Sequence, residues 1–211
     1  MTNDILWNGP PTAALTIVLA HGAGAPMDSP FMNDMAERLT KHGHRVARFE
    51  FPYMAKRRID GKKRPPDRAQ VLIDTYRAVI QHIGTPEKLV IGGKSMGGRI
   101  ASMIADAENV KALLCLGYPF HPTGKPEKLR VAHLQTLKTP ALICHGTRDP
   151  FGTPDEVATY GLSPALSMYW VADGNHDFTP RKASGRDMAQ NLADCGLAIH
   201  AFLQNPALSR T

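Results

Sequence analysis

Gly93-Lys94-Ser95-Met96-Gly97 directly follows the apolar run 88–91 (KLVI) and directly precedes a run with helical periodicity. This order predicts a strand that turns sharply into a helix. Such a turn holds its central residue in a strained conformation and presents the serine hydroxyl at the edge of a sheet. The glycines two residues before and two residues after Ser95 leave room for the turn. The pattern therefore predicts a nucleophile elbow, provided that the chain also supplies a base, an acid and an oxyanion site.

Apolar runs alternate with stretches of helical periodicity along the whole chain. Six runs predict strands, at residues 15–20, 45–51, 88–91, 110–116, 141–144 and 166–171. Apolar residues spaced three and four apart predict helices at residues 31–39, 72–83, 100–107 and 188–203. Several strands are apolar throughout, which is typical of a parallel sheet that is covered on both faces. The sequence therefore predicts an α/β fold with a mostly parallel central sheet and helices on both faces, as a single domain over residues 1–211.

Candidate partners for Ser95 follow it in the chain order of the α/β-hydrolase fold, which is serine, acid, histidine. Asp149 follows the predicted strand 141–144, and His176 follows the predicted strand 166–171. We expect His176 to take the proton of the Ser95 hydroxyl, and Asp149 to orient the imidazole and stabilise the imidazolium. The sequence thus predicts a catalytic triad of these three residues.

Other side chains compete for two of these roles. His121 and His145 also lie near predicted strand ends, and Asp173 and Asp177 lie close to His176 in the sequence. The chain order favours His176 over the other histidines. Acids one to three residues away from a histidine in the same loop are poorly placed to reach its far ring nitrogen, which favours Asp149.

Gly93-Lys94-Ser95 also fits the end of a phosphate-binding loop of the form G-x-x-x-x-G-K-[ST]. That loop requires a glycine at position 88, where this chain has Lys88 inside a predicted strand. The segment that would wrap the phosphates is therefore absent from the sequence, and nucleotide hydrolysis is not favoured.

A glycine-rich segment, residues 21–25 (HGAGA), follows the predicted strand 15–20. Such a turn can aim a backbone N–H at a developing oxyanion, so we expect the amides of Ala23 and Met96 to form the oxyanion hole. No metal and no cofactor is expected. The residues expected to contact the substrate are His21, Gly22, Gly24, Tyr118, Phe120 and Arg58.

The formal net charge of +6 is concentrated in one segment, which we call the basic segment. Residues 56–68 (KRRIDGKKRPPDR) contain seven basic and two acidic residues, a net charge of +5. The simplest interpretation of this charge is a solvated loop. Nucleic-acid binding is not favoured, because no aromatic residues are interleaved with the basic ones.

Three cysteines, Cys115, Cys144 and Cys195, lie in apolar strand-like or helical patterns. An odd number without metal-ligand spacing predicts free, buried thiols in a reducing compartment. The first residues lack the pattern of a signal peptide, and no run reaches the roughly 18 apolar residues of a membrane span. We therefore expect a cytoplasmic protein without membrane contact, whereas the sequence predicts no oligomeric state.

The motifs at residues 19–25 (LAHGAGA), 49–54 (FEFPYM), 64–66 (RPP) and 92–99 (GGKSMGGR) resemble the α/β-hydrolase superfamily, and the resemblance covers residues 15–202. They are most similar to one branch of small bacterial predicted hydrolases, described as dienelactone-hydrolase-like. Its animal relatives include testis-expressed hydrolase-like proteins and a subunit of the NSL chromatin complex. The resemblance implies the α/β-hydrolase fold and a nucleophile at Ser95. It also implies that the basic segment lies at the same edge of the sheet as Ser95, where its charge would favour an anionic acyl substrate. Dienelactone hydrolases proper use a cysteine there, so the resemblance does not extend to their activity.

These patterns predict a serine hydrolase that cleaves a carboxylic ester or a related acyl bond of a small molecule through an acyl-enzyme. The alternative is a non-catalytic protein with the same fold that binds an acidic partner through the basic segment. Only about 20 residues separate residue 120 from residue 139, which is the length of an ordinary connection and not of a helical cap. We therefore expect an open site with little or no cap.

Overall fold

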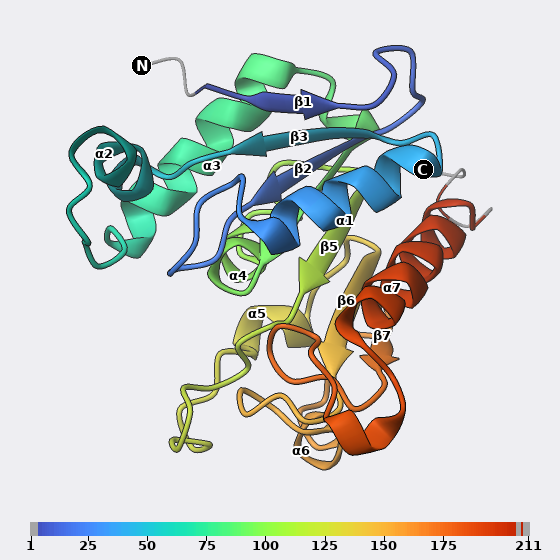
Figure 1. Ribbon diagram of the computed structural model, residues 1–211. Helices are drawn as coiled ribbons and strands as arrows, with labels where there is room; N and C mark the ends of the chain where they lie inside the picture. Colours follow the sequence, from blue (N-terminus) through green and yellow to red (C-terminus); the bar gives the residue numbers. More distant parts are fainter. Residues whose placement is uncertain (1–3, 206–207, 209–211) are drawn as a thin grey trace.

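The computed structural model describes residues 4–205 and 208 of the chain. Its strands are β1 (Leu6–Asn8), β2 (Thr16–Ala20), β3 (Arg45–Phe49), β4 (Leu89–Lys94), β5 (Ala112–Leu116), β6 (Ala141–Gly146) and β7 (Leu166–Val171). They form one sheet in the order β1-β3-β2-β4-β5-β6-β7 (Figure 1). All neighbouring strands are parallel except β1, which pairs with β3 in the antiparallel sense. The mostly parallel sheet is therefore confirmed, and β1 is an additional edge strand too short for its sequence pattern to reveal.

The helices are α1 (Pro30–Lys41), α2 (Pro52–Asp60), α3 (Ala69–Ile83), α4 (Met96–Ser102), α5 (Ala132–Gln135), α6 (Pro154–Ala158) and α7 (Met188–Leu203). Single 3-10 turns lie at Pro86–Lys88 and Lys182–Ser184. Proline in the first turn favours the starts of α1, α2 and α6, since the missing N–H has no partner there. A capping box between Asp187 and Gln190 begins α7. Among the described helices, none is long and apolar enough to cross a membrane.

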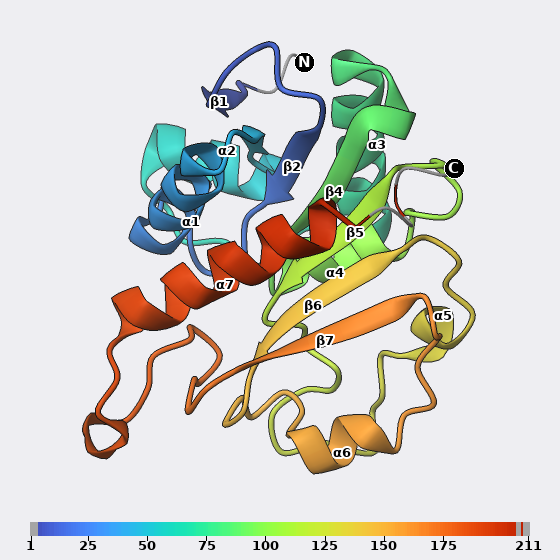
Figure 2. The ribbon, with the colours of Figure 1, turned by 90° about the vertical axis from the view of Figure 1, so that its right-hand side faces the viewer.

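Two layers of helices enclose the sheet (Figures 1 and 2). One face packs against α1 and α7, and the other packs against α3, α4, α5 and α6, with α2 contributing to the same core. The side chains of β2 alternate between the two cores. Ile17 and Leu19 pack into the core that contains α1 and α7, and Val18 and Ala20 pack into the core on the other face. All four side chains are completely buried, as expected for a parallel sheet between two helical layers.

The basic segment differs from its predicted loop over its first part. Residues 56–60 belong to α2, which begins with Pro52 in its first turn and ends at Gly61, a left-handed residue with φ of 68°. Glycine adopts this conformation without steric cost, so the helix ends there and the loop begins. Only residues 61–68 form a non-helical connection before α3.

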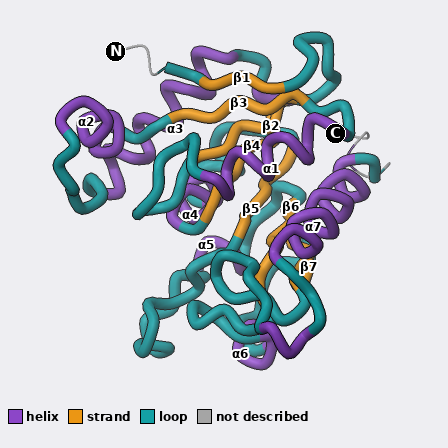
Figure 3. The backbone as a smooth tube through the Cα atoms, viewed as in Figure 1, coloured by secondary structure: helices purple, strands orange, loops and turns teal. Residues whose placement is uncertain are grey.

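The connections that follow β5, β6 and β7 are mainly loops, and they gather beyond the carboxyl ends of these strands (Figure 3). Between β5 and β6 the chain contains a single short helix, α5. The expected absence of a cap domain is confirmed. In an open parallel sheet, side chains that carry function gather at this edge, and Asp149 and His176 lie on two of these loops.

Candidate active site

Ser95 lies at the junction of β4 and α4 with φ of 51° and ψ of −111°, a conformation that is strained for a residue with a side chain. Its N–H donates to the carbonyl of Leu116 at 3.0 Å. A Cβ atom at Gly93 or Gly97 would lie 2.2 or 2.4 Å from the carbonyl oxygen of Ala20. Both glycines are therefore required because the backbone of β2 passes directly beside the turn.

The structure brings together the three residues that the chain order selects. The Ser95 hydroxyl lies 2.8 Å from His176 Nε2, and His176 Nδ1 lies 2.7 Å from Asp149 Oδ2. With Nδ1 protonated, the ring donates to the carboxylate and accepts from the serine. The side chain of Asp149 is completely buried, whereas that of His176 is 20% exposed. The Asp149 carboxylate is thus shielded from water, while the His176 ring is accessible at the surface of the site.

Asp149 is held in its ionised form by its neighbours. Burial on its own raises the pKa of this carboxyl, but the hydrogen bond from His176, the nearby His145 and the backbone N–H of Phe151 lower the pKa overall. The N–H of Phe151 donates to Asp149 Oδ1 at 2.9 Å. A carboxylate that stays charged can stabilise an imidazolium at His176.

His145 and His121, the competing histidines, make no contact with Ser95. His145 Nδ1 accepts from the N–H of Tyr118 at 3.1 Å, and its Nε2 donates to the carbonyl of Gly152 at 2.8 Å. Burial lowers the pKa of His145 to about 4, so this ring is neutral and links two loops. His121 is also buried, with its Nδ1 3.0 Å from a backbone carbonyl.

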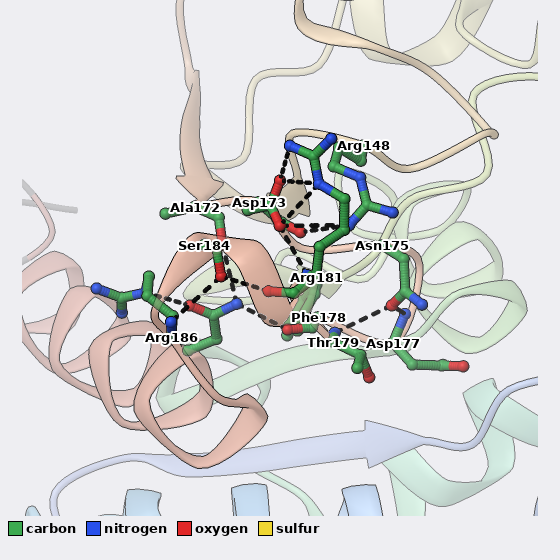
Figure 4. A network of polar contacts seen from close by, with 11 residues as sticks. Arg148, Ala172, Asp173, Asn175, Asp177, Phe178, Thr179, Arg181, Ser184 and Arg186 are labelled. Atoms are coloured by element: carbon green, nitrogen blue, oxygen red, sulfur yellow. Dashed lines mark hydrogen bonds and ion pairs between the residues drawn. The ribbon is translucent and has the colours of Figure 1, made fainter.

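His176 belongs to residues 172–181, which we call the histidine loop, and its shape is fixed by its own polar side chains (Figure 4). Asp173 adopts φ of 51° and accepts from the N–H of Arg181 at 2.7 Å and from its guanidinium. Asn175 Oδ1 accepts from the N–H groups of Asp177 and Thr179 at 2.9 and 3.0 Å. These bonds close two turns around His176.

Neighbouring elements hold the ends of the histidine loop. Arg148 donates to the carbonyl of Asp173 at 2.9 Å. Asn191, a buried residue of α7, donates to the carbonyls of Ala172 and Phe178 at 3.0 and 2.8 Å (Figure 4). Asn191 belongs to the packed helix α7 and Arg148 to the turn after β6, so the loop is held at both ends as a support for the imidazole.

Lys94, the residue before the nucleophile, connects the elbow to the histidine loop. Its ammonium donates to the carbonyl of His176 at 2.8 Å and lies 3.2 Å from Asp177 Oδ1. It also lies 5.3 Å from the centre of the Phe31 ring. Burial lowers the pKa of Lys94, and Asp177 opposes that effect. This contact joins the backbone next to Ser95 to the backbone of the proposed base.

Residues 22–25, which we call the glycine turn, have no polar side chains and are held from α2. Tyr53 Oη donates to the carbonyl of Ala23 at 3.0 Å and lies 3.4 Å from that of Gly22. Arg57 donates to the carbonyl of Gly24 at 3.1 Å. In a trans peptide the C=O and the following N–H point in opposite directions. Carbonyls that face α2 therefore turn the amides of the glycine turn away from it.

The two amides expected at the oxyanion hole are free to donate. Within residues 4–205, neither the N–H of Ala23 nor that of Met96 donates to a protein acceptor. Unpaired N–H groups beside a nucleophilic serine are the donors that an oxyanion requires.

A cavity of about 370 Å³ lies beside Ser95 at the carboxyl edge of the sheet. The backbone of the glycine turn forms one wall, and apolar side chains of Phe31, Met32 and Phe151 form others. The Phe151 ring lies 4.5 Å from the His176 ring, centre to centre. The site therefore combines an apolar wall with a small number of polar groups, which is the usual composition of a small-molecule pocket.

A family model described as an alpha/beta hydrolase domain matches residues 13–204. The chain belongs to this alpha/beta hydrolase family.

Solved structures of alpha/beta hydrolases share its fold. A serine hydrolase homologue from Coxiella burnetii has a TM-score of 0.71 and 18% identity, covering 92% of this chain and 90% of that chain. Dienelactone hydrolase from Anabaena variabilis has a TM-score of 0.69 and 20% identity, covering 94% and 89%. A serine hydrolase without lid from Xanthomonas campestris has a TM-score of 0.67 and 18% identity, covering 95% and 88%. The predicted superfamily is confirmed, and the likeness to dienelactone hydrolase holds at the level of the fold.

Four of the expected substrate contacts lie elsewhere in this alpha/beta hydrolase. His21, Tyr118 and Phe120 are buried, with no exposed surface, and do not line the cavity beside Ser95. Arg58 forms ion pairs with Asp28 and Glu50 at 2.8 and 2.6 Å and does not line it either. Gly22 and Gly24, in contrast, form part of its wall.

Local turns explain these corrections. Gly117 has φ of 70°, and the following N–H donates to His145, so the side chain of Tyr118 turns back into the core. His21 donates from Nδ1 to the carbonyl of Gly22 at 2.7 Å and accepts at Nε2 from the N–H of Phe51 at 3.1 Å. This ring therefore supports the glycine turn from beneath and has no nitrogen left for a substrate.

Sequence reasoning missed Phe31, Met32, Phe151 and Lys94 as cavity residues. The pattern of α1 places Phe31 on a core face, and apolar residues of a core and of a pocket wall look alike in a sequence. The sequence did contain an indication for Lys94, because a residue directly before Ser95 must lie at the same end of the strand. The contact with the histidine loop depends on a fold that brings distant segments together.

No metal centre accompanies these residues in the described part of the chain, where no group of three or more His, Cys, Asp or Glu side chains is arranged to hold an ion. The three cysteines are free and buried, as predicted. A second cavity, of about 330 Å³, lies at the opposite edge of the sheet beside Lys111 and Pro140. Of its two carboxylates, Glu87 and Asp106, the latter is occupied by hydrogen bonds from Thr139 and the N–H of Lys138.

Proposed function

We propose that this alpha/beta hydrolase is a serine hydrolase that cleaves a carboxylic ester or a related acyl bond of a small molecule. The observation that carries the proposal is the continuous pair of hydrogen bonds from Ser95 through His176 to the buried Asp149, at 2.8 and 2.7 Å. The strained backbone at Ser95 adds support, because such strain is costly and persists at functional sites. A binding protein that merely kept the fold would have no need of either feature.

The proposed reaction has two halves. His176 Nε2 takes the proton of Ser95 as Oγ attacks the acyl carbon, and the bond to the leaving group breaks as His176 returns that proton to it. Water, deprotonated by His176, then attacks the acyl-enzyme and releases the acid and the free serine. Asp149 stabilises the imidazolium in both halves without accepting its proton.

The oxyanion of each tetrahedral intermediate would accept hydrogen bonds from the amides of Ala23 and Met96. Both amides lie in turns beside Ser95 and have no protein acceptor within the described residues. Donors fixed before the reaction begins stabilise the developing charge without a cost of reorientation. The carbonyl contacts from Tyr53 and His21 supply that fixation at the glycine turn.

The acyl or alkyl group of the substrate would lie against Phe31, Met32 and Phe151 in the cavity of about 370 Å³. The charge of the basic segment is smaller in effect than its composition implies, since Arg58 pairs with two acids and Arg64 pairs with Asp60. A neutral ester with a short acyl chain is therefore the first substrate to test. Three buried free thiols also support the proposal of a cytoplasmic location.

The test is steady-state hydrolysis of chromogenic esters of graded acyl length by the wild type and by Ser95→Ala. The variant should lose activity by about 10⁴-fold or more, since the nucleophile contributes most of the covalent route. Ser167→Ala is a matched control, because Ser167 is exposed on β7 and should leave activity unchanged. Folded wild type that hydrolyses none of the esters, or activity that survives Ser95→Ala, would contradict the proposal.

A further inference from the structure

The described arginines differ in what their guanidinium groups contact. Most of them form ion pairs with carboxylates, namely Arg38, Arg58, Arg64, Arg77, Arg148, Arg181 and Arg186. Four guanidinium groups have no hydrogen-bond or ion-pair partner within residues 4–205. Of these, Arg68 is exposed and Arg45 lies 4.0 Å from the centre of the Trp7 ring, which leaves Arg99 and Arg130. Both side chains are nevertheless half-buried.

These two arginines lie on the same side of the sheet, close to the elbow. Arg99 is one helical turn after the nucleophile on α4, and its N–H donates to the carbonyl of Ser95 at 3.0 Å. Arg130 lies two residues before the start of α5, and its N–H donates to the carbonyl of Phe120 at 2.7 Å. Neither arginine lines the cavity beside Ser95, so their surroundings are separate from the proposed reaction pocket.

Polar side chains connect the backbone carbonyls of the two arginines. Ser102 Oγ donates to the carbonyl of Arg99 at 2.7 Å and lies 2.8 Å from His133 Nε2. Tyr118 Oη donates to the carbonyl of Arg130 at 3.0 Å and lies 3.3 Å from the same nitrogen. Since both hydroxyl protons are used, His133 donates from Nε2, and its Nδ1 has no partner among the described residues. We call these five residues the arginine cluster.

Among the residues that the structure describes, no carboxylate forms an ion pair with Arg99 or Arg130 of the arginine cluster. Burial and the charge of Arg99 lower the pKa of Arg130. Burial and the same charge also lower the pKa of His133. Two guanidinium groups close enough to repel each other, without a carboxylate between them, are unfavourable on their own.

One atom of the arginine cluster is left without any acceptor. Arg99 Nε is buried from solvent and has no hydrogen-bond partner. Buried donors without acceptors are rare and costly in folded proteins, and an ion or another unseen ligand is one of the few explanations. Arginine donors in a planar fork match the oxygens of carboxylate and phosphate.

We propose that the arginine cluster binds the oxyanion group of a ligand, a phosphate or a carboxylate, between the guanidinium groups of Arg99 and Arg130. The ligand would supply the acceptor that Arg99 Nε lacks and the negative charge that the two arginines lack. Its source is either a free anion or the anionic end of a substrate whose acyl group reaches Ser95. The proposal concerns binding and does not depend on the proposed hydrolase activity.

The test is the thermal unfolding midpoint as a function of inorganic phosphate, with sodium chloride of equal ionic strength as the reference. The wild type should show a saturable rise in midpoint that chloride does not produce, because a ligand that binds only the folded state stabilises it. Arg99→Gln and Arg130→Gln should each weaken phosphate binding at least about tenfold, since each removes one charged partner.

Arg68→Gln is the matched control, because Arg68 is exposed and lies in the basic segment away from the arginine cluster. This variant should bind phosphate as the wild type does. Equal midpoints in phosphate and chloride, or an equal rise in the wild type and in Arg130→Gln, would overturn the proposal. Arg130 precedes a four-residue helix at the surface, so its variant tests the site even if Arg99→Gln does not fold.

A kinetic arm distinguishes the two sources of the anion once phosphate binding is established. Phosphate that competes with an aryl hemisuccinate, but not with the matching neutral aryl acetate, assigns the cluster to the anionic end of the substrate. Phosphate that affects both esters alike, or neither, assigns it to a separate anion. This arm depends on the proposed function, whereas the unfolding measurement does not, so failure of one is distinguishable from failure of the other.

Discussion

The two segments that flank Ser95 are held in place in opposite ways. The histidine loop is fixed largely by its own side chains, with Asp173 and Asn175 closing turns around His176. The glycine turn has no polar side chains of its own and is held by other elements, through Tyr53 and Arg57 of α2. The histidine loop supplies most of the side chains that hold it in place, whereas the side chains that hold the glycine turn come from α2.

This difference fits the roles that we propose for the two segments, a base at His176 and an oxyanion hole in the glycine turn. A base has to place a side chain, so its loop can use the neighbouring side chains as braces. An oxyanion hole has to place backbone N–H groups close to a substrate, so small residues leave room and the braces must come from outside. We therefore expect substitutions within or directly beneath the histidine loop to impair the positioning of His176. Substitutions on α2 should instead impair the positioning of the backbone N–H groups of the glycine turn.

The largest effect should come from the acid beneath the histidine loop. Asp149→Asn should reduce kcat by about 10³- to 10⁴-fold while the protein stays folded, because the imidazole loses its orienting and charge-stabilising partner. Steady-state ester hydrolysis measures kcat, and circular dichroism shows whether the variant is folded. Asp155→Asn, a change at an exposed acid of α6, is the control and should leave kcat unaltered. A loss of less than about tenfold would show that Asp149 does not support the base.

Low pH should reduce the stability of the protein through His145, which links Tyr118 to Gly152 as a neutral ring. Burial lowers the pKa of His145 to about 4 in the folded state, from 6.5. Between these values the unfolded chain binds more protons, so the free energy of unfolding falls as the pH falls from about 6.5 towards 4. His145 alone should contribute about 1 kcal/mol per pH unit near pH 5.

Urea denaturation at pH 7, 6 and 5 measures this slope. His44, whose pKa is also lowered to about 4 by burial and by the neighbouring His200 and His42, acts in the same direction. His44→Gln should therefore flatten the slope without abolishing it. A free energy of unfolding that stays constant from pH 6.5 to pH 5 would contradict the assignment of neutral, buried imidazoles.

Tyr53→Phe should weaken the support of the glycine turn, because it removes the hydrogen bond from Tyr53 Oη to the carbonyl of Ala23. Loss of an oxyanion-hole donor typically costs 10²- to 10³-fold in kcat. Here the donor is kept and only one of its supports is removed, since His21 and Arg57 remain, so we expect about a fivefold decrease in kcat with little change in KM. Tyr169→Phe is the matched control, because Tyr169 lies on β7 outside the cavity. A variant that loses stability but keeps its kcat would show that Tyr53 has only a structural role.

The smallest effect should come from Asp173→Asn. The ion pairs of Asp173 with Arg181 and Arg148 lie at the surface, where such pairs contribute little, and Asn175 and Asn191 still close the loop. We expect kcat to fall by less than about threefold, together with faster amide hydrogen exchange in residues 173–181. Asp60→Asn removes a comparable surface ion pair from the basic segment and should alter neither quantity. Exchange that does not change would place the support of the loop elsewhere.

The fold and the proximity of the three proposed catalytic side chains could be predicted from the sequence because both follow local rules. Strands of a parallel sheet are apolar throughout, and their carboxyl ends meet at one edge, so Ser95, Asp149 and His176 had to lie near one another. The need for glycine at the elbow could also be predicted from its sequence pattern. The structural reason could not, because Gly93 and Gly97 are required by the backbone of Ala20, which passes beside them.

The walls and supports of the site could not be predicted, because they depend on side-chain direction and on distant contacts. Tyr118 follows a strand as Asp149 does, yet the left-handed Gly117 turns it into the core. Arg58 belongs to a strongly basic segment, yet Glu50 and Asp28 bind it. Charge counted along a sequence says little about charge in space until the acids nearby are known.

The central claim is that Ser95 is a nucleophile activated by His176, and covalent labelling tests it most directly. Treatment with a fluorophosphonate, followed by intact-mass measurement and peptide mapping, should give one adduct per chain, on Ser95. The adduct should be absent from Ser95→Ala and should form far more slowly in His176→Ala, because the hydroxyl then lacks its base. Folded wild type without an adduct, or an adduct that persists in Ser95→Ala, would contradict the account.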